Sequence, residues 1–393
     1  MFKMKISSSR SRLTGALLSL AAAGAVAAVA APASASAATS ASPVVGHVYV
    51  NDDTAGTNTI GAFDRHADGT LTPEAGSPFQ AGGAGNGTGL ASEGALQITR
   101  DGRFLIAADP GSNQISVLKV NEDGSLRLVH VVSSDGVLPD SIAVHDGLVY
   151  VANAGNGGSN YTGFRLTFTG GLLPIPGSTV ALPDGSAPGD VVFNTTGTKL
   201  AGTRVGTSQI DSFTVGFSGR LTAAPGSPFV GQGLGAFGSE FSPTNPSQLF
   251  VSNPHNPGVG ASTVSAFNDS ANGTLTSVGA SPFADGQNGS CWVEITHNGK
   301  YLFVVNTGSG TISRFSIAAD GSLTVLGSTP ISANGGVGAV DPRLSPDGKF
   351  LYVDESKAGQ VGEFAVNGGN LTELPSSPTP LPAGASAAGI VVN

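Results

Sequence analysis

Short apolar stretches of similar length recur along the chain, and each one ends in polar residues typical of a turn. The copies are HVYVND from His47, FLIAAD from Phe104, LVYVAN from Leu148, KLAGTR from Lys199, QLFVSN from Gln248, YLFVVN from Tyr301 and FLYVDE from Phe350. Runs of this length, rich in Val, Phe and Tyr and bounded by turn residues, are typical of β-strands. Successive copies lie about 50 residues apart, which indicates a structural repeat.

Two further strands are predicted after each copy. The second strand reads TIGAF, QISVL, YTGFR, QIDSF, TVSAF, TISRF or QVGEF, in chain order. A turn and a third strand follow, as in ADGTLTP, EDGSLRL, TGGLLPI, FSGRLTA, ANGTLTS, ADGSLTV and NGGNLTE. Asp-Gly, Asn-Gly and Gly-Gly pairs favour tight hairpins because these residues adopt positive φ angles.

A fourth strand precedes six of the seven copies: ALQIT, SIAVH, DVVFN, SEFSP, WVEIT and PRLSP. The first copy lacks such a strand, while the chain ends in a surplus apolar strand, residues 389–393. We therefore predict an all-β, seven-bladed β-propeller over residues 38–393, with four antiparallel strands in each blade. The C-terminal strand would join the first blade and close the ring, leaving only short protected edges.

The N-terminus has a different pattern. Lys3, Lys5, Arg10 and Arg12 precede an almost unbroken apolar run from Leu13 to Ala31, and small residues follow. This order is typical of a bacterial signal peptide, so we predict cleavage after Ala35 or Ala37, removing residues 1–37, and secretion of the remainder. A retained membrane anchor is the alternative, and the Ala-rich run disfavours it.

Charge and composition narrow the possible partners. The chain of 393 residues carries a net charge of −9, and no basic cluster follows residue 12. Nucleic acid and anionic membranes bind clustered Lys and Arg, so neither is an expected partner. We expect a monomer that takes a small molecule or another extracellular ligand.

Several motifs that suggest chemistry are better explained by the repeat. The acidic turns NEDGS, AADGS and SPDGK lack the ligand spacing of an EF-hand. The six histidines show no His-x-x-x-His spacing, so no structural zinc site and no cofactor are predicted. Cys291, the single cysteine, cannot form an intrachain disulfide and is typical of a small core residue.

The central channel of a propeller is the expected place for a site. One of its mouths would be lined by residues that precede the innermost strands and residues that follow the repeated apolar strands. The first set contains Glu93, Asp140, Asp190, Cys291 and Asp341, and the second contains Asp52, Asp53, Asp109, Asn153, Arg204, Asn253, His255, Asn306, Asp354 and Glu355. This predominantly acidic rim is suited to a cation such as Ca²⁺ or to a sugar. Alternatively, its Asp and Asn side chains cap turns and bind nothing specific.

The repeats beginning at Asp101, Asn298 and Asp347 resemble the blades of the seven-bladed lactonase family, which includes propeller-type 6-phosphogluconolactonases and carboxymuconate cyclases. The resemblance covers nearly the whole mature chain, and it implies a site in the channel with His, Arg and Glu side chains. At the matching places this sequence has Gly94, Asp140, Ala154 and either Cys291 or Phe237, while Pro342 and Arg343 lie two or three residues late.

The absence of the family's His, Arg and Glu at these places bears on whether the protein is an enzyme or a binding protein. Lactone chemistry needs a proton carrier and a positive group for the developing oxyanion, and an Asp in place of an Arg would repel that charge. We therefore expect a binding protein without the family's catalytic residues. The alternative is a hydrolase or lyase acting on a lactone or sugar acid at the channel mouth. A redox propeller would need metal ligands or a basic patch, which the sequence does not suggest.

Overall fold

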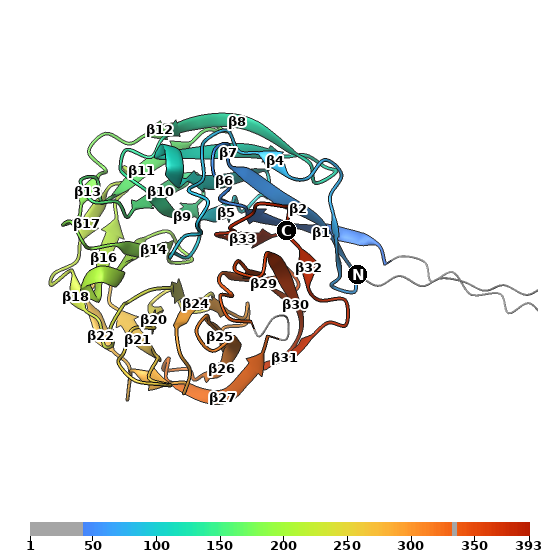
Figure 1. Cartoon of the computed structure of the whole chain (residues 1–393). Coiled ribbons are helices and arrows are strands. Elements are labelled where there is room, and N and C mark those ends of the chain that lie inside the picture. Colours follow the sequence, from blue (N-terminus) through green and yellow to red (C-terminus); the bar gives the residue numbers. More distant parts are fainter. Residues whose placement is uncertain (1–41, 332–335) are drawn as a thin grey trace, which may run out of the picture. The chain divides into compact units, whose positions relative to one another are not determined.

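The computed structural model describes residues 42–331 and 336–393, so the predicted signal peptide lies outside the described residues. Seven antiparallel sheets follow one another around a ring, each turned edge-on to the centre (Figure 1). The predicted seven-bladed propeller is confirmed. None of the helical turns in the described part of the chain is long and apolar enough to span a membrane.

Each blade has its four main strands in the predicted order from the centre outward. The innermost strands of blades 1 to 7 are β33 (Ile390–Val392), β5 (Leu96–Ile98), β9 (Pro139–His145), β14 (Pro188–Phe193), β19 (Ser239–Phe241), β24 (Ser290–Ile295) and β28 (Pro342–Leu344). The second strands are β1 (Val44–Asn51), β6 (Phe104–Asp109), β10 (Leu148–Asn153), β15 (Lys199–Arg204), β20 (Gln248–Asn253), β25 (Tyr301–Asn306) and β29 (Phe350–Glu355). These second strands are the repeated apolar stretches of the sequence.

The two outer strands of each blade are the ones that the hairpin sequences predicted. The third strands are β2 (Thr59–His66), β7 (Gln114–Val120), β11 (Asn160–Leu166), β16 (Gln209–Val215), β21 (Thr263–Asp269), β26 (Thr311–Ile317) and β30 (Gln360–Asn367). The outermost strands are β3 (Leu71–Pro73), β8 (Leu126–Ser133), β12 (Leu172–Pro174), β17 (Leu221–Ala223), β22 (Leu275–Ser277), β27 (Leu323–Pro330) and β31 (Asn370–Glu373).

In five blades the outermost strand is interrupted. A turn follows it, and a two-residue strand then pairs with the same third strand: β4 (Phe79–Gln80), β13 (Val180–Ala181), β18 (Phe229–Val230), β23 (Phe283–Ala284) and β32 (Thr379–Pro380). Blades 2 and 6 have an unbroken outer strand of eight residues instead. Two 3₁₀ turns, η1 (Pro110–Ser112) and η2 (Val205–Thr207), follow the second strands of blades 2 and 4.

The ring closes through the C-terminal strand, as predicted. In β33, Ile390 pairs with Val50 and Val392 pairs with Val48 of β1. Beyond this short ladder, the His47 amide donates a hydrogen bond to Asn393 Oδ1 at 2.7 Å. The two ends of the described chain thus share blade 1.

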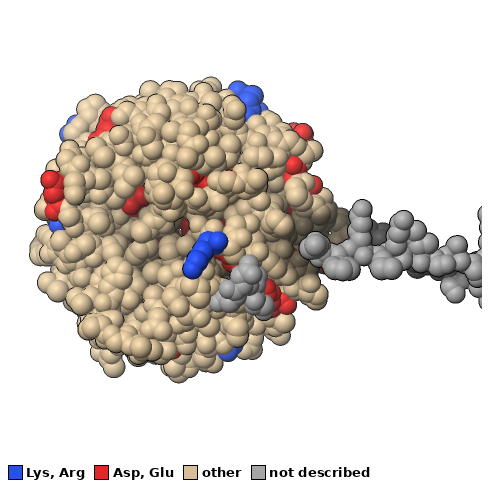
Figure 2. Space-filling model, in the orientation of Figure 1, with Lys and Arg blue, Asp and Glu red and all other residues tan. Residues whose placement is uncertain are grey.

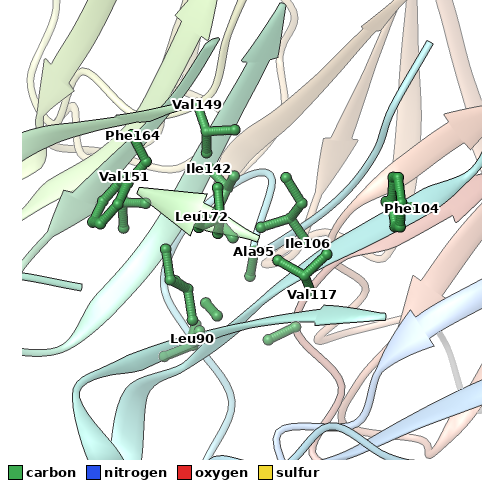
Figure 3. Packing of buried hydrophobic residues seen from close by; sticks show 13 residues of the cluster. Leu90, Ala95, Phe104, Ile106, Val117, Ile142, Val149, Val151, Phe164 and Leu172 are labelled. Atoms are coloured by element: carbon green, nitrogen blue, oxygen red, sulfur yellow. The ribbon is translucent and has the colours of Figure 1, made fainter. Parts of the chain in front are cut away.

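Apolar side chains fill the spaces between neighbouring blades. Seven clusters of buried residues are present, one at each of the seven contacts between blades. Figure 3 shows the cluster between blades 2 and 3, where Ile106 and Val117 face Ile142 and Val149. Because both faces of each blade are buried, the central strands are nearly continuous in hydrophobic residues, which explains their pattern in the sequence.

Candidate functional site

The segment of residues 90–95, which leads into β5 of blade 2, crosses the centre of the ring. The Glu93 amide donates to Gly189 O of blade 4 at 2.8 Å, and Trp292 Nε1 of blade 6 donates to Ser92 O at 2.7 Å. The Gly94 amide donates to Asp341 Oδ2, just before the inner strand of blade 7, at 3.2 Å. This segment, called the channel segment below, therefore joins inner strands on opposite sides of the ring.

Close packing holds the Glu93 side chain in the centre. Its Oε2 accepts a hydrogen bond from the Val293 amide of blade 6 at 3.2 Å. A Cβ atom at Gly238, before the inner strand of blade 5, would lie 2.1 Å from the same oxygen. Gly238 therefore supplies the space that Glu93 occupies.

Further carboxyl groups lie on the innermost strands or directly before them. They are Asp140, Asp190, Glu240, Glu294 and Asp341, from five different blades, and all are buried except Glu240, which is half-buried. Asp190 Oδ2 accepts hydrogen bonds from the Ser239 amide at 3.0 Å and from Ser239 Oγ at 2.6 Å. Together with Glu93 they form the acidic cluster of the channel.

Arg343 is the basic residue of this cluster, and acids already engage it. Its Nη1 lies 2.9 Å from Glu294 Oε2, and its Nη2 lies 3.6 Å from Asp341 Oδ1. Burial opposes the charge of Arg343, but Asp341 and Glu294 more than compensate and raise the pKa of the guanidinium above its ordinary value. Arg343 is therefore a permanent cation whose charge is balanced within the protein.

Burial makes most of the cluster's carboxyls weak acids. It raises the pKa of Asp190 to about 7 and that of Asp341 to about 6. Burial and the nearby Asp190 raise the pKa of Glu93 well above its ordinary value, and burial and Glu294 do the same for Glu240. A protonated carboxyl both donates and accepts hydrogen bonds, so Glu93 and Glu240, and the protonated fraction of Asp190, offer both functions near neutral pH, while Asp341 is mainly the anion that pairs with Arg343.

A cavity of about 280 Å³ adjoins the cluster. Glu93, Asp190, Glu240 and Arg343 line its inner end, while the far ends of inner strands, including His145 and the exposed Thr195, line the other. The cavity thus reaches the surface where the inner strands end. The rim predicted from the sequence lies at their beginnings, where the channel segment fills the centre.

Six residues of the predicted rim bind within their own blades. They follow or end second strands and contact the neighbouring third strand: Asp52 with Thr59, Asp109 with Ser116, Asn153 with Asn160, Arg204 with Asp211, Asn306 with Ser313 and Glu355 with Gln360. Arg204 makes two hydrogen bonds of 2.6 Å to the Asp211 carboxylate. These contacts join the second and third strands of a blade on either side of the turn that connects them.

Three further residues of the predicted rim have different surroundings. The carbonyl of Asp140 accepts a hydrogen bond from Ser92 Oγ at 2.7 Å, so Asp140 contacts the channel segment. Cys291 is buried, and burial together with Glu93 raises the pKa of its thiol to about 12, which makes it a poor nucleophile. His255 is exposed on a loop. On the face shown in Figure 2, acidic side chains are scattered rather than gathered around the centre.

Sequence reasoning missed Glu240, Glu294 and Arg343 as site residues. They occupy the same register in three successive inner strands, opposite Phe250, Phe303 and Tyr352 of the second strands. A charged residue at one repeat position within otherwise buried strands is a signal that alignment of the repeats could have revealed.

The ring of seven four-stranded blades and its acid-lined channel define a seven-bladed propeller with a central pocket. The family model described as lactonase, 7-bladed beta-propeller, matches residues 46–193 and 240–335. The chain therefore belongs to this family, as the resemblance of its repeats indicated.

Solved structures show the same fold at low sequence identity. A putative 6-phosphogluconolactonase from Bacteroides uniformis is similar with a TM-score of 0.70 and 19% identity, covering 88% of this chain and 99% of that chain. A periplasmic gluconolactonase from Pseudomonas aeruginosa is similar with a TM-score of 0.67 and 17% identity, covering 88% and 98%. A comparison with curated protein sequences finds no match.

Proposed function

We propose that the channel cavity binds a small, neutral, polyhydroxylated ligand, such as a sugar or an unphosphorylated sugar lactone, and that the protein lacks its family's catalytic residues. The observation that carries this proposal is the composition of the cavity's inner end. The carboxyls of Glu93, Asp190 and Glu240, all with raised pKa values, lie there beside Arg343. Arg343 is already paired with Glu294.

Hydrogen-bonding capacity supports a ligand rich in hydroxyl groups. Each sugar hydroxyl both donates and accepts, and protonated carboxyls can match either role. Glu240 uses Oε2 to accept from the Ile295 amide at 2.6 Å. A cavity of about 280 Å³ lies near the lower end of the usual range for ligand pockets, so it suits a single sugar ring.

Electrostatics disfavours phosphorylated ligands. A phosphate group needs positive charge that is free to contact it, as Arg or Lys side chains provide. Arg343 is the one Lys or Arg among the residues that line the cavity, and Glu294 and Asp341 neutralise it. We therefore do not expect this protein to bind phosphorylated lactones, although one structure with the same fold is described as a putative 6-phosphogluconolactonase.

A second candidate function is lactone hydrolysis with Asp190 as a general base. A pKa of about 7 suits a proton carrier at neutral pH, and Asp190 lines the cavity. The obstacle is the oxyanion, because the paired Arg343 is a poor donor to a developing negative charge.

Calorimetric titration of the purified protein with glucose, gluconolactone and 6-phosphogluconate distinguishes these functions. We expect the two neutral compounds to bind and the phosphorylated acid not to bind. Val192→Trp, which fills the cavity from β14, should abolish binding, while Thr222→Trp on the exposed outer strand β17 of the same blade should not. Binding of 6-phosphogluconate in preference to the neutral compounds would refute the proposal.

Turnover of gluconolactone decides between the two candidates. We expect a rate equal to spontaneous hydrolysis. A faster rate that disappears in Asp190→Asn would establish the hydrolase instead.

We also propose that the protein acts outside the cell as a monomer after cleavage behind Ala35 or Ala37 removes the signal peptide. The charged start, apolar run and small residues of the N-terminus support this proposal. N-terminal sequencing of protein from the culture medium should begin at Ser36 or Ala38, and intact Met1 in membrane fractions would contradict it.

A further inference from the structure

Three potential metal ligands meet in blade 1, away from the channel cavity. His47 on β1 lies directly opposite Asp64 on β2, and Glu74 follows the outer strand β3. His47 Nδ1 lies 3.3 Å from Asp64 Oδ1 and 3.9 Å from Glu74 Oε2. Nδ1 is buried and has no partner in hydrogen-bond geometry within the described residues.

The residue equivalent to His47 is polar in blades 4 and 5 (Lys199 and Gln248), a tyrosine in blade 6 (Tyr301) and apolar in the other three blades. In blades 2, 3 and 7 the equivalent residue is apolar and packs on the turn glycine of the next blade: Phe104 on Gly170, Leu148 on Gly219 and Phe350 on Gly69. His47 packs in the same way, since a Cβ atom at Gly124 of blade 2 would lie 2.1 Å from its Cε1. Blade 1 therefore places an imidazole at a contact that three other blades fill with a hydrophobic side chain.

Glu74 also differs in chemical type from the equivalent residues of other blades. Its amide donates to the carbonyl of Ala62 on the third strand, and the residues that make the equivalent bond in blades 3, 4, 5 and 7 are Ile175, Ala224, Val278 and Leu374. All four are apolar and buried or partly buried. The Glu74 side chain is only 8% exposed, so blade 1 buries a carboxyl where these blades bury hydrocarbon. Such a substitution destabilises a fold unless a partner compensates for the lost hydration.

We propose that His47, Asp64 and Glu74 bind one divalent transition metal ion, with Zn²⁺ as the best match. Zinc takes imidazole nitrogen and carboxylate oxygen at about 2.0–2.2 Å in tetrahedral geometry, which places neighbouring ligand atoms about 3.3–3.6 Å apart. The three ligand atoms all lie within 4.8 Å of one another. The nitrogen ligand disfavours Ca²⁺, which prefers oxygen alone. Asp64 is 28% exposed, so water can complete the coordination.

The ion would stabilise the closure of the ring. The carbonyl of His47 accepts a hydrogen bond from the Asn393 amide at 3.0 Å, and its amide donates to Asn393 Oδ1. A metal bound to His47 would fix β1 against β2 and the segment after β3, at the place where the C-terminus joins blade 1. This role is independent of any ligand in the channel.

Blade 5 supplies a matched set of replacements. Gln248 and Asn268 form the cross-strand pair equivalent to His47 and Asp64, and Val278 is the equivalent of Glu74. The test titrates the metal-free purified protein with Zn²⁺ by calorimetry and with Co²⁺ by visible absorption. Wild type should bind one ion per chain, with the absorption of a tetrahedral cobalt site, and zinc should raise its melting temperature. The triple variant His47→Gln, Asp64→Asn, Glu74→Val should lose all three effects.

Three further variants complete the test. Glu74→Val alone should remove the site while preserving or raising the melting temperature of the metal-free protein. Glu122→Gln and His255→Gln, both exposed, should leave stoichiometry and affinity unchanged. Absence of zinc and cobalt binding to wild type, or equal binding to folded Glu74→Val, would overturn the proposal.

Discussion

At the residue scale, burial determines the chemistry of the channel. Carboxyls that would be anionic in water are enclosed by inner strands from several blades, and hydrogen bonds such as those from Ser239 to Asp190 only partly replace the lost hydration. The raised pKa values of Glu93, Asp190 and Glu240 follow from that loss. The same burial makes these groups suitable partners for neutral hydroxyls.

This burial predicts an unusual dependence of stability on pH. Asp190 and Asp341 have folded pKa values of about 7 and 6, whereas an unfolded Asp has a pKa of about 3.9. Between these values the folded chain binds more protons than the unfolded chain, so the free energy of unfolding falls as pH rises. We expect a loss on the order of 2 kcal/mol or more between pH 5 and pH 8. Urea unfolding at both pH values measures it.

Asp190→Asn provides the control for this prediction. An amide cannot ionise, so the variant should show a smaller decrease in unfolding free energy over the same interval. Equal or greater stability of the wild type at pH 8 would contradict the account of the cluster.

Gly238 gives a second prediction at this scale. Gly238→Ala places a methyl group 2.1 Å from Glu93 Oε2 and 2.5 Å from Cys291 O, so the channel segment or β24 must move. We expect a destabilisation of about 1–3 kcal/mol, as is usual for an overpacked interior. Gly216→Ala, whose added Cβ would be 3.4 Å from the nearest atom, is the control and should differ little from wild type. Equal melting temperatures of the two variants would refute the packing of Glu93.

At the element scale, most of the architecture follows from local sequence signals. Asp-Gly and Asn-Gly turns define the hairpins, and the apolar second strands are recognisable because both their faces are buried. The missing leading strand at His47 and the surplus strand at residues 389–393 predicted the closure by β33 correctly. The interruption of five outer strands escaped prediction, because two-residue strands such as β4 carry no periodicity.

The closing strand makes a direct prediction. Ile390 is fully buried in the cluster between blades 7 and 1. Ile390→Ala should cost about 2–5 kcal/mol, as is typical of a large aliphatic residue replaced by Ala in a core. Val45→Ala, at a position 49% exposed on β1, should change stability by no more than about 0.5 kcal/mol. Chemical denaturation compares the two, and similar small effects would show that β33 contributes little to closure.

The candidate site was harder to predict than the fold because its residues are assembled across the ring. Glu93 was named for a mouth of the channel, but its contacts with Gly189 and Val293 depend on how the channel segment crosses blades far apart in sequence. His47, Asp64 and Glu74 likewise have no recognisable spacing. They become notable only when each is compared with its counterpart in the other blades.

At the scale of the whole molecule, seven similar blades produce one asymmetric channel. The channel segment fills it where the inner strands begin, and the cavity remains where they end. A ligand should therefore approach from the side of His145 and Thr195 and contact Asp190 and Glu240 at the inner end.

A crystal structure of the protein soaked with gluconolactone tests this account most directly. We expect electron density for the sugar ring in the cavity, with hydroxyl groups within hydrogen-bond distance of the Asp190 or Glu240 carboxyl, and no such density in a crystal of Val192→Trp. Density at the opposite mouth beside Asp52 and Glu355, or an empty cavity at a saturating concentration of the lactone, would contradict it.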